Sequence, residues 1–113
     1  MLDYKEHDTV VAAISHLPHL VASSLVNLVK DSDSPAETMK QVAAGGFKDI
    51  TRIASSSPEM WEQICMTNAE PIADMLERYI DSLQDILSEI KDHQGNAIYK
   101  LFEKIQGLPQ YHY

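Results

Sequence analysis

The sequence has few of the residues that cross-link a chain or turn it sharply: 113 residues include one cysteine, four glycines and five prolines. A single cysteine, Cys65, cannot form an internal disulfide, so a reducing, cytoplasmic setting fits the chain. Sparse glycine and proline favour helices over a sheet with many turns. The length suits one domain, and we predict that residues 1–113 form a single helical domain.

Basic residues are also scarce, with 9 Lys and Arg against 17 Asp and Glu and a formal net charge of -8. This acidic excess disfavours nucleic acid and anionic membrane surfaces as partners. The charged start, residues 1–8, is unlike a signal peptide. Residues 9–29 carry no Asp, Glu, Lys or Arg, but they hold two histidines, a proline, an asparagine and three serines. Such polar density disfavours a membrane span and predicts a helix buried in protein.

Apolar residues recur every three or four positions along most of the chain, a spacing typical of α-helices. The sequence therefore predicts an all-α fold with two long helices and several short ones. Pro18 should kink the first long helix locally. The expected helices are 9–29, 34–45 behind a capping box at Ser34-Pro35-Ala36-Glu37, 47–54, a short one after Ser57-Pro58, a long one capped by Asn68 and reaching Ile90, and 98–105 before a stop at Gly107.

The first predicted helix has an unusual distribution of side chains. Its large apolar residues form one stripe, while the opposite face is small and polar but uncharged around Ser15 and His19. Solvated faces normally collect Glu and Lys, so we expect another molecule or domain to cover this face. The helix also has too little of its own chain to bury it, which predicts a homodimer with this helix at its centre.

Two clusters of polar residues are candidates for chemistry. The histidines His7, His16 and His19, with Asp8, either ligate a metal ion or satisfy hydrogen bonds in a buried interface. Further along, Lys48 and Arg52 follow Gly45-Gly46 and lie one helical turn apart.

Two cations on one helical face, near a helix N-terminus, suit a small carboxylate or phosphate, although Asp49 could instead neutralise them on a solvated surface. Trp61 is either core or a stacking wall, and Cys65 is more typical of inert packing. Composition and spacing alone predict an anion-binding helical module.

Four strings, in this order and spacing, resemble the C-terminal helical domain of bacterial prephenate dehydrogenases: His7-Asp8, Ser15-His16-Leu17-Pro18-His19-Leu20-Val21-Ala22, Gly45-Gly46-Phe47-Lys48-Asp49-Ile50-Thr51-Arg52-Ile53-Ala54 and Pro58-Glu59-Met60-Trp61. In that family the helical domain dimerises and closes over the substrate beside a Rossmann domain that binds NAD or NADP. The enzymes convert prephenate to 4-hydroxyphenylpyruvate by oxidative decarboxylation in tyrosine biosynthesis.

The resemblance implies a role for each matching residue. Arg52 would hold a substrate carboxylate, supported by Lys48 and His19. Asp49 would not touch the substrate but would hold the side chain of Lys48 or Arg52 in position. Trp61 would approach the site, either from the same chain or from the second subunit of the dimer. The remaining residues, which would shape the pocket, are Ser15, His16, His7 and Asp8.

The resemblance also implies what this chain does not supply. The family's catalytic histidine and its Gly-rich nucleotide loop belong to the Rossmann domain, and glycines at 45, 46, 95 and 107 cannot form that loop. We therefore expect no catalytic, cofactor-binding or metal-binding residue in this chain and no activity of the chain alone. We also expect a domain boundary at Met1-Leu2-Asp3 and the start of a further segment at 108–113. The alternative is a stand-alone helical interaction or anion-binding module without enzymatic activity.

Overall fold

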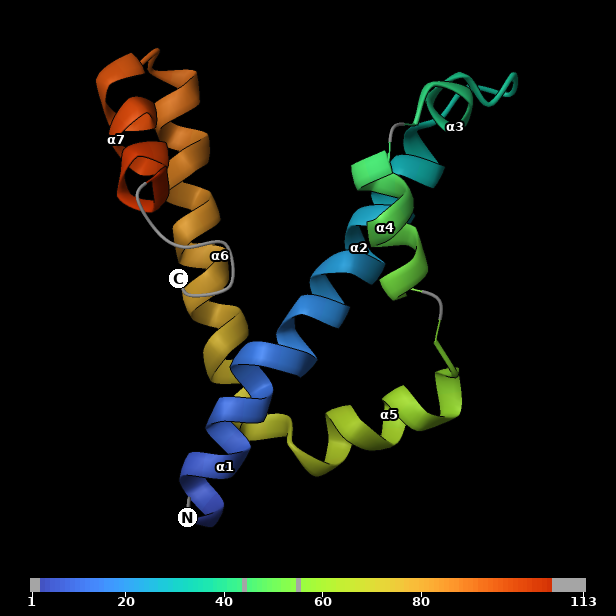
Figure 1. Cartoon of the computed structure of the whole chain (residues 1–113), viewed down its shortest axis with the longest axis vertical. Helices are drawn as coiled ribbons and strands as arrows, with labels where there is room; N and C mark the ends of the chain where they lie inside the picture. The colour runs from blue at the N-terminus through green and yellow to red at the C-terminus, as the bar shows by residue number, and fades with distance from the viewer. Residues whose placement is uncertain (1–2, 44, 55, 107–113) are drawn as a thin grey trace. The chain divides into compact units, whose positions relative to one another are not determined.

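The computed structural model describes residues 3–43, 45–54 and 56–106, and every regular element among them is a helix (Figure 1). The predicted all-α fold is confirmed. The chain divides into two compact units, Met1–Leu76 and Glu77–Tyr113. The predicted stop at Gly107 and the segment 108–113 lie outside the described residues. The elements are α1 (Tyr4–Val11), a π-helical turn (Ala12–His16), α2 (Leu17–Ser32), α3 (Thr38–Val42), α4 (Gly45–Ala54), α5 (Pro58–Thr67), α6 (Ala69–Lys91) and α7 (Gly95–Gln106).

The first long helix continues without a break from Tyr4 to Ser32, and by length and composition it could cross a membrane. It begins where the Asp3 carboxylate accepts a hydrogen bond from the Glu6 amide at 2.7 Å. Before Pro18, where we predicted a kink, the helix widens into the π-helical turn, and the Leu17 amide bonds to the Ala12 carbonyl. Because proline has no amide hydrogen, the α-helical bonding pattern cannot continue through this position.

We expected another molecule or domain to cover the small polar face of this helix, but the chain itself buries part of that face. Ala12 and Ala22, on the small-residue face, are the buried hydrophobic residues of the helix, whereas Ile14 and Leu28 on the apolar stripe are 66% and 62% exposed. The same chain therefore buries part of the small face, and α4 runs back along α2 (Figure 1). The exposed part of the large apolar stripe, with Ile14 and Leu28, is therefore available to a partner, while Leu17, Val21 and Leu25 are half-buried.

The helices that follow bring a second set of residues back to α1. The half-buried Phe47, Ile50 and Ala54 share one face of α4, which packs against α2. The Ser57 hydroxyl then caps α5 by accepting a bond from the Met60 amide at 3.3 Å, as predicted. Asn68 joins α5 to α6, and its amide group bonds to α1 and to His16. The sequence predicts Asn68 as the cap of α6, and its backbone carbonyl accepts the Ile72 amide at 3.1 Å, while its side-chain amide nitrogen makes a tertiary contact.

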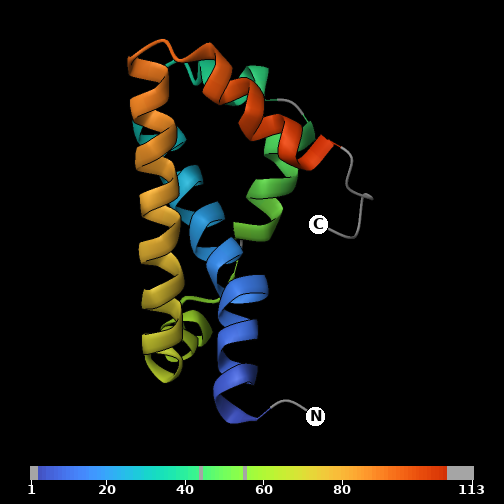
Figure 2. The same cartoon turned by 90° about the vertical axis from the view of Figure 1, so that its left-hand side faces the viewer.

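The second unit consists of the rest of α6, a turn and α7. His93 takes a left-handed conformation in the turn, with φ of 55°, and Figure 2 shows α7 leaving it at an angle to α6. The large apolar residues of both helices remain exposed: Leu83 is 44%, Ile90 58% and Phe102 63% exposed. Exposed side chains of this size at helical spacing are typical of an interaction surface.

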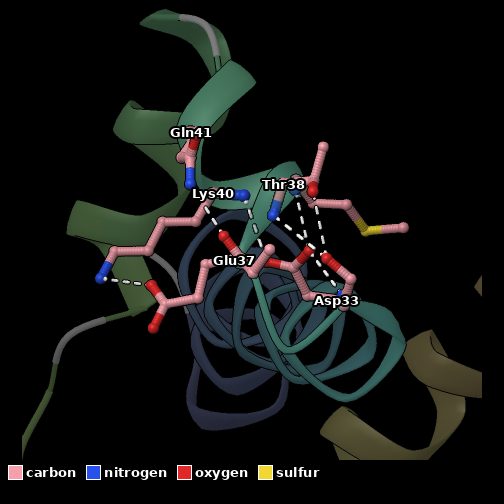
Figure 3. A network of polar contacts seen from close by, with 8 residues as sticks. Asp33, Glu37, Thr38, Lys40 and Gln41 are labelled. Atoms are coloured by element: carbon pink, nitrogen blue, oxygen red, sulfur yellow. Dashed lines mark hydrogen bonds and ion pairs between the residues drawn. The ribbon is translucent and has the colours of Figure 1, made fainter.

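The predicted helix 34–45 is wrong in its start and its cap. Ser34 to Glu37 form a turn, Glu37 has a left-handed φ of 55°, and only Thr38–Val42 are helical. The cap is Asp33, whose carboxylate accepts bonds from the amides of Ser34 (2.9 Å), Met39 (2.8 Å) and Lys40 (3.2 Å) (Figure 3). An ionised carboxylate is a stronger acceptor than the Ser34 hydroxyl, so it determines where the helix begins.

Asp33→Ala should therefore unfold α3. The Met39 amide, above all, lowers the pKa of Asp33 below 3.8, so the stabilisation is present above that pH and is lost as the pH falls through the lowered value. We expect the NMR chemical shifts of residues 38–42 to lose their helical character in Asp33→Ala at pH 7 and in the parent protein at low pH. Glu37→Gln, which removes only the Lys40–Glu37 ion pair (3.1 Å), is the control and should keep α3. Helical shifts that survive in Asp33→Ala would contradict this cap.

Candidate functional site

Three aromatic rings from two distant segments meet in the first unit. Trp61 on α5 stacks on His19 of α2, with ring centroids 4.3 Å apart and planes at 21°. The His16 ring meets the Trp61 ring edge to face at 5.9 Å. Trp61 therefore packs against the predicted histidines of its own chain. Its Nε1 is buried and has no hydrogen-bond acceptor among the described residues, so the group carries an unused donor.

A cavity of about 430 Å³ lies beside these rings, between α1 and α5. His7, Asp8 and His16 line it together with Asn68, so three residues that the sequence assigned to one pocket do meet. His7 Nδ1 lies 3.2 Å from the Asp8 carboxylate. Asn68 donates from Nδ2 to the Asp8 backbone carbonyl at 3.0 Å and lies 3.2 Å from His16 Nδ1.

The surroundings of His16 favour its neutral form. Burial lowers the pKa of this imidazole below 6.5, and the charge of nearby His19 lowers it further. A neutral imidazole is one donor and one acceptor, which suits binding to carbonyl and carboxylate oxygens. Ser15, from the same π-helical turn, is exposed.

The two cations of α4 lie at different places. Lys48 lines a cavity of about 790 Å³ with Thr51, Phe47 and residues of α2 and α3. Arg52 is not among the described residues that line this cavity. Arg52 lies in the last turn of α4, where the helix dipole is negative, and its Nη2 lies 3.4 Å from the Asp49 carboxylate. Our expectation that both cations lie near the positive end of this helix is therefore wrong for Arg52. The predicted pairing of Asp49 with one of the cations is confirmed for Arg52.

Sequence reasoning missed several residues that line these cavities, among them Lys30, Lys40 and Asn68. Lys30 and Lys40 join Lys48 around the larger cavity, and Asn68 joins the smaller one. Nothing in their local sequence indicates this, because the α2–α3 turn and the α5–α6 junction bring them in from 8 to 60 residues away along the chain. Among the described residues, no three His, Cys, Asp or Glu side chains gather closely enough to hold a metal ion, so the metal interpretation of the histidines gains no support.

The chain is similar to known proteins over nearly its whole length. Residues 3–104 match the family model described as "Prephenate dehydrogenase, dimerization domain". The chain is 39% identical over 109 residues to the prephenate dehydrogenase of Bacillus subtilis (strain 168), covering 93% of this chain and 29% of that protein. It is 31% identical over 107 residues to the cyclohexadienyl dehydrogenase of Zymomonas mobilis, covering 94% of this chain and 36% of that protein.

A solved structure has the same fold. The crystal structure of prephenate dehydrogenase from A. aeolicus, in complex with hydroxyphenyl propionate and NAD+, superposes with a TM-score of 0.84 at 31% identity, covering 93% of this chain and 37% of that one. This chain thus spans about a third of the length of the proteins it matches.

Proposed function

Since the chain belongs to the prephenate dehydrogenase dimerization-domain family, we propose that it binds the substrate's carboxylate and forms the dimer in an NAD(P)-dependent prephenate dehydrogenase of tyrosine biosynthesis. The observation that carries this proposal is the meeting of His16, His19 and Trp61 within the family match. These three side chains come from two helices more than 40 residues apart, and they place hydrogen-bond donors around one aromatic surface.

The substrate class follows from the chemistry of these donors. Prephenate carries two carboxylates, a ring hydroxyl and a pyruvyl carbonyl, so its site needs fixed cations and donors. Arg52 holds a carboxylate through two nitrogens, which a planar guanidinium does better than an ammonium. The family resemblance assigns supporting roles to Lys48 and His19, although in a single copy Lys48 lines a separate cavity against α2 and α3. Asp49 orients the Arg52 side chain through their 3.4 Å contact.

The other site residues shape the pocket around the ring. His16 donates a hydrogen bond, while Ser15, His7 and Asp8 form the polar wall beside it. Trp61 closes the aromatic side of the site by its stack on His19 at 4.3 Å.

The reaction oxidises the ring carbinol and releases the ring carboxylate as carbon dioxide. The nucleotide, NAD or NADP, takes the hydride and is bound by a Rossmann domain outside this chain. This chain alone is therefore inactive: it binds and orients the substrate, and the group that accepts the carbinol proton comes from the other domain. We place the enzyme in the cytoplasm, where its soluble substrate and nucleotide are found.

A homodimer completes the proposal. The exposed apolar stripe of the first helix, with Ile14 and Leu28, and the exposed apolar residues of α6 and α7 are the surfaces that a second copy covers. Their exposure in one copy and their helical spacing support this assignment.

The test is a chimeric enzyme in which this chain replaces the matching third of the B. subtilis prephenate dehydrogenase. We expect the chimera to oxidise prephenate with NAD+, as measured by NADH absorbance and by the product 4-hydroxyphenylpyruvate. The chain without the added domain should give no turnover under the same conditions.

A further inference from the structure

Asn68 is a buried polar residue to which the proposed function assigns no role. It is 8% exposed at the junction of α5 and α6, and its side chain reaches the first long helix. Nδ2 donates to the backbone carbonyl of Asp8 at 3.0 Å and lies 3.2 Å from His16 Nδ1. One contact, with Asp8, precedes the π-helical turn, and the other is with His16, the last residue of that turn.

The chemistry of the two partners fixes the orientation of the amide. A backbone carbonyl only accepts, so the nitrogen of the Asn68 amide, rather than its oxygen, must face Asp8. That NH2 group has two hydrogens. One is used by the Asp8 carbonyl, and the other points at His16 Nδ1, which must then present a lone pair.

We infer that Asn68 is a positioning residue that holds His16 as a neutral imidazole with its proton on Nε2. Protonation of Nδ1 would bring two N–H groups face to face and would break the contact with Asn68. His16 is thereby a hydrogen-bond donor through Nε2 and is not a cation. The π-helical turn contributes to this geometry, because it brings His16 to the side chain that also holds Asp8.

The other groups around His16 are consistent with this assignment. From α1, Asp8 and His7 line the same cavity, and the Asp8 carboxylate contacts His7 Nδ1 at 3.2 Å. From α5, the lining residues Met60, Gln63, Ile64 and Thr67 carry no charge. His19, one turn further along the helix, disfavours a positive His16 when it is itself protonated.

A specificity follows, and it rests on the proposed function. A neutral Nε2–H can donate to a carbonyl or hydroxyl oxygen and carries no charge that selects for an anion, whereas an imidazolium would select for the anion. His16 is therefore suited to the uncharged oxygens of the substrate, and Arg52 to its carboxylates. The tautomer itself can be measured without substrate or turnover.

The experiment is a long-range 1H–15N NMR correlation of the 15N-labelled 113-residue chain, with the His16 signals assigned by comparison with His16→Gln. At pH 7 the parent should show a proton on Nε2 and an unprotonated Nδ1. In Asn68→Asp, a carboxylate faces Nδ1 and accepts a hydrogen bond from it when it is protonated, which stabilises the imidazolium, so the titration midpoint of His16 should rise by about one pH unit or more. His93, in the α6–α7 turn, is the control and should keep its midpoint in the same variant.

Two outcomes would overturn the inference. One is a parent protein whose His16 carries its proton on Nδ1 or on both nitrogens at pH 7, a result that needs no variant. The other is a folded Asn68→Asp variant in which the His16 midpoint stays at the parent value. An inactive chimera whose His16 has the Nε2 tautomer would instead count against the proposed function alone.

Discussion

Arg52→Ala should lower kcat/KM of the chimeric enzyme for prephenate by about 10- to 100-fold. A hydrogen-bonded charge pair contributes about 1.5–3 kcal/mol, and each 1.36 kcal/mol is a factor of ten in rate. The variant should fold normally, because the Arg52 side chain is 75% exposed and its ion pair with Asp49 is a surface contact. Steady-state kinetics measures the change in kcat/KM, and far-UV circular dichroism shows whether the variant keeps its helical fold.

Two companion variants make this result specific. Arg52→Lys keeps the positive charge but cannot make the bidentate hydrogen bonds of a guanidinium. Its kcat/KM should therefore lie between the values of the parent and of Arg52→Ala. Arg78→Ala on α6 removes the other arginine of the chain and should leave kcat/KM within about twofold of the parent. If Arg52→Ala retained parental kcat/KM, the assignment of the carboxylate-binding residue would be wrong.

Leu83→Glu with Ile90→Glu should dissociate the dimer. Both residues lie on the apolar face of α6, where they are 44% and 58% exposed in a single copy. Burying a Leu or Ile contributes about 1.5–3 kcal/mol, and a twofold interface loses each side chain twice. We therefore expect Kd for dimerisation to rise at least about 1000-fold, as measured by sedimentation velocity over a concentration series.

The matched control places the same two charges on the other side of α6. At 100° per residue, Gln84 and Ser88 lie about 100° and 140° from Leu83, away from the apolar face. Gln84→Glu with Ser88→Glu should sediment as the parent dimer does. A Leu83→Glu, Ile90→Glu protein that still sediments as a dimer at the parental Kd would exclude this face from the interface.

The positions of most helices follow from the sequence, because their determinants are local. Apolar residues at helical spacing predict α6, and Ser57 followed by Pro58 predicts the start of α5 correctly. At α3 the local signals compete. Ser34 to Glu37 match a capping box, but the Asp33 carboxylate binds three backbone amides and moves the start of the helix to Thr38.

The candidate site was only partly predictable, because tertiary contacts determine its geometry. Asn68 satisfies the local rule for a helix cap, yet a carbonyl 60 residues away binds its amide nitrogen. The spacing of Lys48 and Arg52 puts both on α4, but it cannot show that α2 and α3 surround Lys48 while Arg52 turns to Asp49. The four sequence strings taken together predicted the family correctly, whereas the geometry deduced for Lys48 and Arg52 from their spacing was partly wrong.

The same distinction applies to the first helix. Its pattern predicts two chemically different faces, and both are present. Which face the chain itself covers depends on how closely other helices can approach, and the small side chains at Ala12 and Ala22 are the ones that become buried. The large side chains at Ile14 and Leu28 are left for a partner.

The central claim is that this chain is the substrate-binding and dimer-forming part of a prephenate dehydrogenase, and turnover by the chimeric enzyme tests it most directly. The account predicts NAD+-dependent conversion of prephenate to 4-hydroxyphenylpyruvate and carbon dioxide by the chimera. It also predicts no conversion by either half alone. A chimera that folds, dimerises and binds NAD+ but gives no NADH with prephenate would contradict the account.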